Sequence, residues 1–292
     1  MTQTVAERWA SSRSYHHSLY PSGRIASERT RSVSVCLPAR ECAATVERIV
    51  EALLALRAEG AIDEVVVVDA ASPDGTAELA ERAGAVVWQE SELMPAQGPV
   101  LGKGDAMWRA LSMLAGELIC FLDADSEGFS PHFATGLIGP LVCEPGVAFV
   151  KAFYRRPFSR AGVEEPEGGG RVNHLMARPA LALFYPELAG IRQPLAGEVA
   201  ARRELLEALP FATGYGVETA MLIDVWREAG LDAIAQVDLD EHRNRHQPLS
   251  ALTPMAATVL ATIAHRLEQE GRLRPVGGAP LERPPLASVT IA

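Results

Sequence analysis

Two carboxylates stand directly after an apolar run in the first half of the chain. Asp123 and Asp125 follow residues 118–122, which read Leu-Ile-Cys-Phe-Leu. Such a run predicts a buried strand, and residues two positions apart at its carboxyl end point to the same side. Mg²⁺ is commonly held by one or two carboxylates together with the phosphates of a substrate. The pair therefore predicts a cation site, although a lone D-x-D is more often a surface turn.

Other polar residues follow predicted strands or lie in glycine turns. Asp69 ends the valine run 65–68, at a position suited to hydrogen-bond a base or a ribose. Lys103 lies between two glycines, which would let an ammonium approach a phosphate closely. His242 follows the predicted strand 231–239 and could complete a metal shell through a neutral imidazole nitrogen. Taken singly, each has an ordinary structural reading as a cap, a turn or a buried side chain.

The charge of the chain limits its partners. The 292 residues carry a formal net charge of −10, which disfavours non-specific binding to nucleic acid or to an anionic membrane. A phosphorylated substrate must then be bound by local basic clusters, and we expect two of four to act: residues 155–156, 171, 202–203 and 243–245. Glycines 168–170 beside Arg171 offer backbone N–H groups and a guanidinium fork, which suit a ligand carrying phosphate and carboxylate.

The order of predicted elements indicates the fold class. Strands at 33–37, 64–68, 85–88 and 118–122 alternate with helices at 43–57, 76–83 and 103–114. This β-α-β-α-β-α-β order predicts an α/β protein with a mainly parallel, Rossmann-like sheet, helices on both faces and ligands at the carboxyl edge. No G-x-G-x-x-G opens the first helix and no P-loop motif occurs. Helices at 174–183, 198–209 and 217–229 and a strand at 231–239 follow.

Composition sets off the two ends of the chain. We expect a flexible N-terminal arm over residues 1–30 and a tail over 266–292. The uncharged stretch 248–264 is too short and too polar to span a membrane, and predicts a buried or dimer-facing helix. The first thirty residues hold no apolar signal segment, and the four cysteines show no metal or disulfide spacing. These features favour a cytoplasmic protein.

Taken together in their order, the motifs resemble one family of glycosyltransferases. The chain is similar to the retaining GT-A-fold enzymes of glycosyltransferase family 81, which make glucosyl- or mannosyl-3-phosphoglycerate. The resemblance runs from about residue 33 to residue 249. It implies a nucleotide-sugar-binding half over residues 31–126 and an acceptor-binding half of the same domain over 127–265. The segments that carry it are Leu37-Pro38-Ala39, Gly102-Lys103-Gly104, Asp123-Ala124-Asp125, residues 151–157, residues 168–172, residues 193–198, residues 215–218 and residues 242–245.

The resemblance implies a role for each matching residue. The nucleotide-sugar side would comprise Pro38, Ala39, Arg40, Glu41, Asp69, Lys103, Asp123, Ala124, Tyr215 and Glu218. Asp125 and His242 would hold Mg²⁺, Mn²⁺ or another divalent cation. The 3-phosphoglycerate acceptor would contact Gly170, Arg171, Asn173 and Asn244. Glu218, Lys103 and the backbone carbonyl of Leu195 would act in catalysis. The resemblance also implies that the enzyme is a homodimer.

Two departures from the family pattern concern the nucleotide. Where the family reads Pro-Ala-Leu-Asn-Glu-Glu, residues 38–43 read Pro-Ala-Arg-Glu-Cys-Ala, and where it reads Asp-Ser-Gly-Ser, residues 69–72 read Asp-Ala-Ala-Ser. Base preference therefore stays open among GDP-mannose, GDP-glucose and UDP-glucose. The alternatives are a GT-A transferase with another small or lipid-linked acceptor, and an inactive nucleotide-sugar-binding protein. A sugar-phosphate nucleotidyltransferase lacks support, because its basic glycine-rich loop is missing.

Overall fold

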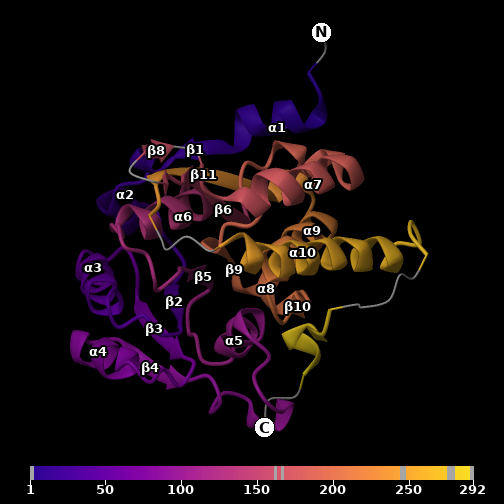
Figure 1. Cartoon of the computed structure of the whole chain (residues 1–292). Coiled ribbons are helices and arrows are strands. Elements are labelled where there is room, and N and C mark those ends of the chain that lie inside the picture. Colours follow the sequence, from indigo (N-terminus) through magenta and orange to yellow (C-terminus); the bar gives the residue numbers. More distant parts are fainter. Residues whose placement is uncertain (1–2, 161–162, 166–167, 244–247, 275–279, 290–292) are drawn as a thin grey trace.

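A computed structural model describes residues 3–160, 163–165, 168–243, 248–274 and 280–289. Within these ranges an eight-stranded sheet has the strand order β1-β11-β6-β9-β5-β2-β3-β4 (Figure 1). Its strands are β1 (Ser14–His16), β2 (Val33–Ala39), β3 (Glu64–Asp69), β4 (Val86–Gln89), β5 (Leu118–Phe121), β6 (Phe149–Arg155), β9 (Val199–Arg202) and β11 (Ile234–Glu241). All neighbouring pairs are parallel except those that β9 makes with β5 and β6. The prediction of a mainly parallel α/β sheet is confirmed.

Helices cover both faces of this sheet (Figure 1). One core joins the sheet to α2, α3, α4 and α6, and the other joins it to α1, α5, α7, α8, α9 and α10. The helices are α1 (Val5–Arg13), α2 (Ser22–Glu28), α3 (Val46–Ala58), α4 (Thr76–Ala83), α5 (Lys103–Ala110), α6 (His132–Cys143), α7 (Arg178–Phe184), α8 (Arg203–Ala208), α9 (Val217–Ala229) and α10 (Leu249–Gln269).

The valine run of β3 shows why the two faces both need apolar residues. Val65 and Val67 pack into one core, whereas Val66 and Val68 pack into the other. Successive side chains of a strand point to opposite faces, so a strand covered on both sides reads as a continuous apolar run. The predicted reading of this run is confirmed.

Short pieces complete the fold. Two-stranded sheets are formed by β7 (Phe158–Arg160) with β8 (Val163–Glu165) and by β10 (Phe211–Ala212) with β12 (Glu282–Arg283). A π-helical turn at Asn173–Ala177 leads into α7.

The expected flexible N-terminal arm is wrong for residues 3–30. They form α1, β1 and α2, and β1 adds to the sheet beside β11. Trp9 is buried and its indole Nε1–H donates to the carbonyl of Ile234 at 3.0 Å. Tyr20 is buried against Gly139 of α6, where a Cβ would lie 2.1 Å from the ring. A few large apolar residues among many polar ones anchor this segment, and overall composition does not detect them.

Two further expectations need correction. Residues 198–209 were expected to form one helix, but β9 precedes α8, because Val199, Ala200 and Ala201 are buried between β5 and β6. The tail expected over 266–292 is ordered in part, since Arg266 is buried and β12 pairs with β10. Strands from both proposed halves join one sheet, so the division at residue 126 stays a prediction. No helix in the described ranges is long and apolar enough to cross a membrane.

Candidate active site

A cavity of about 510 Å³ lies at the carboxyl edge of the parallel strands. Strands β2, β3, β5, β6 and β11 all end at this edge, and β9 begins there because it runs the opposite way. The topology therefore brings loops from distant parts of the chain to one place. Of the predicted site residues, those that line the cavity are Arg40, Glu41, Lys103, Asp123, Asp125, Gly170, Arg171, Asn173, Leu195, Tyr215 and Glu218.

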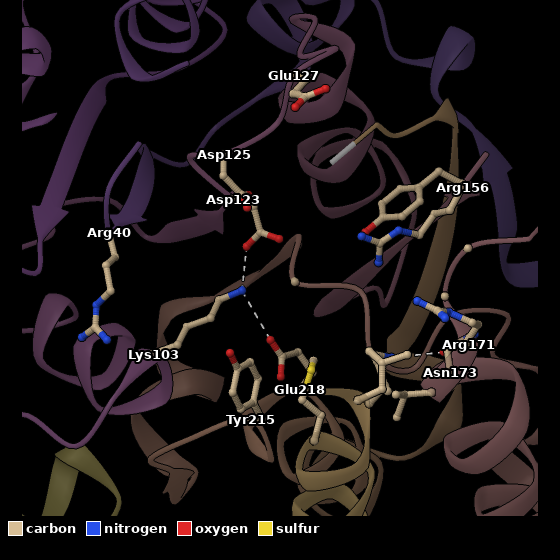
Figure 2. A pocket seen from close by; sticks show the side chains of 18 of the residues that line it. Arg40, Lys103, Asp123, Asp125, Glu127, Arg156, Arg171, Asn173, Tyr215 and Glu218 are labelled. Carbon is tan, nitrogen blue, oxygen red and sulfur yellow. Dashed lines mark hydrogen bonds and ion pairs between the residues drawn. The ribbon is translucent and has the colours of Figure 1, made fainter. Parts of the chain in front are cut away.

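Lys103 forms the centre of the cavity (Figure 2). Its Nζ donates to Asp123 Oδ1 at 2.6 Å and lies 3.3 Å from Glu218 Oε1. Burial disfavours the ammonium, but the carboxylates of Asp123 and Glu218 outweigh burial and raise the pKa of Lys103. The Lys103 side chain remains 32% exposed, so a ligand in the cavity can reach a charge that stays on at neutral pH.

The two glycines beside Lys103 have backbone roles. Gly102 has φ +106°, a conformation that favours glycine, and directly precedes α5. A Cβ at Gly104 would lie 1.9 Å from the carbonyl oxygen of Ala212. Both glycines therefore fix the start of α5, and with it Lys103, against the Thr213 segment, whose carbonyl accepts from the Gly104 N–H at 3.1 Å.

Gly197 is a site residue to which the sequence analysis gave no role. A Cβ at this position would lie 2.6 Å from Lys103 Nζ and 2.6 Å from each carboxylate oxygen of Asp123. The backbone before β9 thus passes directly against the central ion pair. The signal in the sequence was a glycine between Ala196 and Glu198, which by itself does not separate close packing from a loop.

Asp125 and His242 present two potential metal ligands at different depths. Asp125 lines the cavity, and burial together with the neighbouring Asp123 raises the pKa of its carboxyl. His242 is buried behind the cavity wall, with Nε2 2.8 Å from Ser126 Oγ and 3.1 Å from Glu198 Oε1. Only the contact with Ser126 has hydrogen-bond geometry, since within the described residues Glu198 Oε1 and His242 Nδ1 are buried without a hydrogen-bond partner.

The buried Glu198 sets the charge of His242. Burial opposes the imidazolium, but Glu198 outweighs it and raises the pKa of His242, and in return His242 lowers the pKa of the Glu198 carboxyl against the effect of burial. Tyr154 donates to Glu198 Oε2 at 2.8 Å, and its ring stacks on His242 with centroids 4.6 Å apart. The neighbouring carboxylates of Asp123 and Asp125 and the Nδ1 atom of His242, which has no hydrogen-bond partner within the part of the chain that the structure describes, fit a divalent cation. Its binding to His242 would displace a proton.

Arg171 and Asn173, two of the predicted acceptor residues, lie on the side of the cavity opposite Arg40 (Figure 2). Gly170 has φ +66°, Arg171 lies over the Phe158 ring at 5.0 Å, and both line the cavity. Asn173 is mostly buried, and its Nδ2 donates to the carbonyl of Arg192 at 3.2 Å, so it also supports the loop that carries Leu195. Asn244 lies outside the described residues.

Among the basic clusters, Arg156 and Arg171 line the cavity. The Arg156 guanidinium lies over the Tyr154 ring, 5.8 Å from its centroid. Arg203 bonds instead to the carbonyls of Leu111 and Gly116, away from the cavity. In the sequence, Arg156 stands out only as one of a basic pair with Arg155, which by itself does not assign it a role.

Four residues assigned to the nucleotide-sugar side do not line the cavity. Pro38 and Ala39 lie at the end of β2, and the carbonyl of the buried Ala124 accepts from Thr45 Oγ1 at 2.6 Å. Asp69 is buried, and its Oδ2 accepts from the Ser72 N–H at 2.9 Å and from Gln89 Nε2 at 3.2 Å.

Tyr215 and Lys151 differ sharply in exposure. Tyr215 lines the cavity and is 62% exposed, which leaves its ring available to a ligand. Lys151 of β6 is fully buried, and its Nζ donates to the carbonyl of Ala196 at 2.5 Å. Lys151 therefore holds the turn between Leu195 and Gly197 from beneath, a role that the sequence analysis missed.

Comparison with known proteins agrees with this geometry. The protein-family model described as "Glycosyl transferase family 2" matches residues 34–173 of this chain. A glucosyl-3-phosphoglycerate synthase of Petrotoga mobilis is 40% identical over 267 residues, which cover 89% of this chain and 82% of the relative. The chain belongs to the glucosyl- and mannosyl-3-phosphoglycerate synthase family. The same enzyme of Mycolicibacterium smegmatis is 42% identical over 90% of this chain and 86% of its own length.

Solved structures of the synthase family share the whole fold. Mannosyl-3-phosphoglycerate synthase from Rubrobacter xylanophilus matches with a TM-score of 0.90 and 44% identity, over 97% of this chain and 99% of that one. Glucosyl-3-phosphoglycerate synthase from Mycobacterium tuberculosis, in complex with Mn²⁺, UDP-glucose and phosphoglyceric acid, matches with a TM-score of 0.81 and 38% identity, over 92% and 95%. The chain is therefore a glycosyltransferase with the GT-A fold, as the motifs predicted.

Proposed function

We propose that the chain transfers mannose or glucose from a nucleotide-sugar to the hydroxyl of 3-phosphoglycerate. The single observation that carries this is the cavity itself. An ammonium held between Asp123 and Glu218 stands at its centre, and Arg156 and Arg171 line the side opposite Arg40. A donor diphosphate and an anionic acceptor need such separate positive groups in an otherwise acidic protein.

The acceptor explains the arginine side of the cavity. 3-Phosphoglycerate carries a phosphate and a carboxylate, and planar guanidinium groups bind both through paired hydrogen bonds. Arg171 supplies one such group. The expected backbone donors are partly used within the protein, because the N–H groups of Gly168 and Gly169 donate to the carbonyls of Glu165 at 3.2 Å and Arg156 at 2.9 Å. Arg156 lies on the same side and is our addition to the acceptor residues.

The donor side holds the leaving group. Lys103 neutralises charge on the nucleoside diphosphate as the glycosidic bond breaks, and Asp123 fixes the position of its ammonium. Asp125 and His242 would hold a divalent cation, which supplies Lewis-acid stabilisation of the same diphosphate when bound. We assign Mg²⁺ or Mn²⁺ to this position because the oxygens of the Asp125 carboxylate and of the donor diphosphate suit both ions.

We infer retention of the anomeric configuration without a protein nucleophile. The acceptor hydroxyl attacks the face from which the diphosphate leaves, and the leaving phosphate takes its proton. Glu218 and the carbonyl of Leu195 face the developing positive charge on the sugar. Replacement of Glu218 by Gln keeps the shape of the side chain and removes its charge, so we expect kcat to fall. Full turnover in Glu218→Gln would leave this side chain a packing role only.

The identity of the donor is decided by a panel assay. Release of nucleoside diphosphate is measured from GDP-mannose, GDP-glucose, UDP-mannose and UDP-glucose with Mg²⁺, with and without D-3-phosphoglycerate. We expect release that requires the acceptor, with one base clearly preferred. Release that does not depend on 3-phosphoglycerate would mean that water hydrolyses the donor. No release from any donor would indicate a transferase with a different acceptor or a nucleotide-sugar-binding protein without catalysis.

We propose further that the enzyme acts in the cytoplasm as a homodimer. Leu175, Leu183, Leu249 and Leu260 are large apolar side chains left exposed on α10, on α7 and on the π-helical turn before α7. These elements contact one another, so a second copy could cover the leucines together. Light scattering tests the assembly, and a monomeric mass would contradict it.

A further inference from the structure

Two adjacent histidines and an aspartate form a cluster outside the cavity. His16 Nε2 lies 3.3 Å from Asp240 Oδ1, and His17 Nε2 lies 2.7 Å from Asp240 Oδ2. One ligand atom from each of the three residues lies within 4.8 Å of the others. The side chains of His16 and Asp240 are 45% and 52% exposed, so an ion in solvent can reach them.

The fold aims these side chains at one another. His16 ends β1 and pairs in parallel register with Asp238 of β11. The register of β11 with β6 shifts between Asp238 and Glu241, and Asp240 in this irregularity has φ +66°. Its N–H donates to Asp238 Oδ1 at 3.0 Å, which supports the left-handed conformation. A bulge that holds a non-glycine residue in this region turns the Asp240 carboxylate toward the imidazoles.

The donor set and its spacing match a borderline transition metal. Zn²⁺ binds imidazole nitrogen and carboxylate oxygen at roughly 2.0–2.2 Å, which places neighbouring ligand atoms of a tetrahedron about 3.3 Å apart. The distance from His16 Nε2 to Asp240 Oδ1 is 3.3 Å, which equals this value. The 2.7 Å between His17 Nε2 and Asp240 Oδ2 needs only a small increase. Two imidazoles with one carboxylate suit Zn²⁺ better than Mg²⁺, which prefers oxygen ligands.

Neighbouring groups hold the imidazoles in place. The Nδ1 atom of His16 accepts from the Ser18 N–H at 3.2 Å and lies 2.8 Å from Ser18 Oγ, so Nε2 is the nitrogen that faces Asp240. The ring of His132 stacks on His17 with centroids 4.0 Å apart, and its Nε2 contacts the carbonyl of Leu239 at 3.1 Å. These contacts fix the positions of the rings, and Zn²⁺ bound at His16 Nε2 displaces the proton that this nitrogen otherwise directs toward Asp240.

We propose that His16, His17 and Asp240 form a second cation site, selective for Zn²⁺ and distinct from the catalytic metal position. Water completes its coordination. The bound ion joins β1 to β11, the strand that ends just before His242, and so fixes the N-terminal segment to the edge of the sheet. The site does not depend on the glycosyltransferase reaction.

The test uses the full chain with Asp125→Asn, which weakens the catalytic metal position, and titrates Zn²⁺ by calorimetry in excess Mg²⁺. We expect one equivalent to bind, and a rise in the thermal unfolding temperature. Adding His17→Gln or Asp240→Asn should weaken binding at least about tenfold and remove the thermal shift. His265→Gln is the matched control, because His265 also lies near carboxylates but on α10.

Folding and metal geometry are checked separately. Circular dichroism of the metal-free variants shows whether they fold, and the absorption of Co²⁺ bound to the chain carrying only Asp125→Asn reports coordination without mutation of the cluster. An intense visible band of four-coordinate Co²⁺ supports the site. The proposal would be overturned if the Asp125→Asn chain bound no Zn²⁺, or if the Zn²⁺ affinity were equal after His17→Gln. The three residues would then form His–Asp ion pairs without a metal.

Discussion

Replacement of Lys103 by Met tests the centre of the cavity. The ammonium lies 2.6 Å from Asp123 and 3.3 Å from Glu218, and a donor diphosphate would approach the same group. Two unit charges 4 Å apart interact by about 4 kcal/mol at the effective dielectric constant typical near a protein surface. Because the Lys103 side chain is 32% exposed, solvent screening reduces this to about 3 kcal/mol. We therefore expect kcat/KM to fall roughly 100- to 200-fold.

The assay measures nucleoside diphosphate release by Lys103→Met at saturating acceptor, with thermal unfolding in the same buffer. Arg227→Met is the matched control, since Arg227 lies on α9 with Glu218 and pairs at 3.7 Å with Asp224 outside the cavity. The control should retain a kcat/KM near that of the unmodified enzyme. A folded Lys103→Met enzyme that keeps more than about a tenth of the activity would refute the charge argument, because that loss is under 1.4 kcal/mol.

Three further changes probe other parts of the site. In Gly197→Ala the new Cβ would lie 2.6 Å from Lys103 Nζ and displace the ammonium, so we expect a roughly 100-fold lower kcat at a nearly unchanged unfolding temperature. A normal kcat would contradict the close packing of Gly197 against Lys103. Burial lowers the pKa of Lys151 to about 8 from 10.5, so between pH 8 and 10.5 the unfolded chain binds more protons than the native state. The free energy of unfolding should therefore rise with pH over this range, by up to about 3 kcal/mol relative to Lys151→Met in denaturant titrations. A difference in unfolding free energy between the two proteins that does not change with pH would refute this. Arg156→Gln should raise the KM for the acceptor about tenfold or more and leave the KM for the donor unchanged. A rise in the donor KM instead would show that Arg156 binds the donor and not the acceptor.

The first half of the fold could be predicted because its local signals agree. Apolar runs mark β2, β3 and β5, and α4 has the predicted bounds 76–83. Parallel strands with right-handed helical connections then bring Lys103 and Asp123 to one edge without knowledge of side-chain contacts. The same logic placed Arg171 and Glu218 only with the help of the family resemblance, since their segments carry no such alternation.

The remaining errors come from contacts between residues distant in the sequence. Strand β9 has the composition of a helix start, and only its position between β5 and β6 makes it a strand. The N-terminal segment is held by Trp9 and Tyr20, whose partners lie more than a hundred residues away. Gly197 and Lys151 were missed for the same reason, because close approach and burial depend on tertiary packing.

Transfer of a hexose to 3-phosphoglycerate with retention is tested most directly by proton NMR of the reaction of the preferred donor with D-3-phosphoglycerate and Mg²⁺. We expect an α-linked glycosyl-3-phosphoglycerate that accumulates in step with nucleoside diphosphate and is not formed without the acceptor. A β-linked product, or free sugar with unchanged 3-phosphoglycerate, would contradict it.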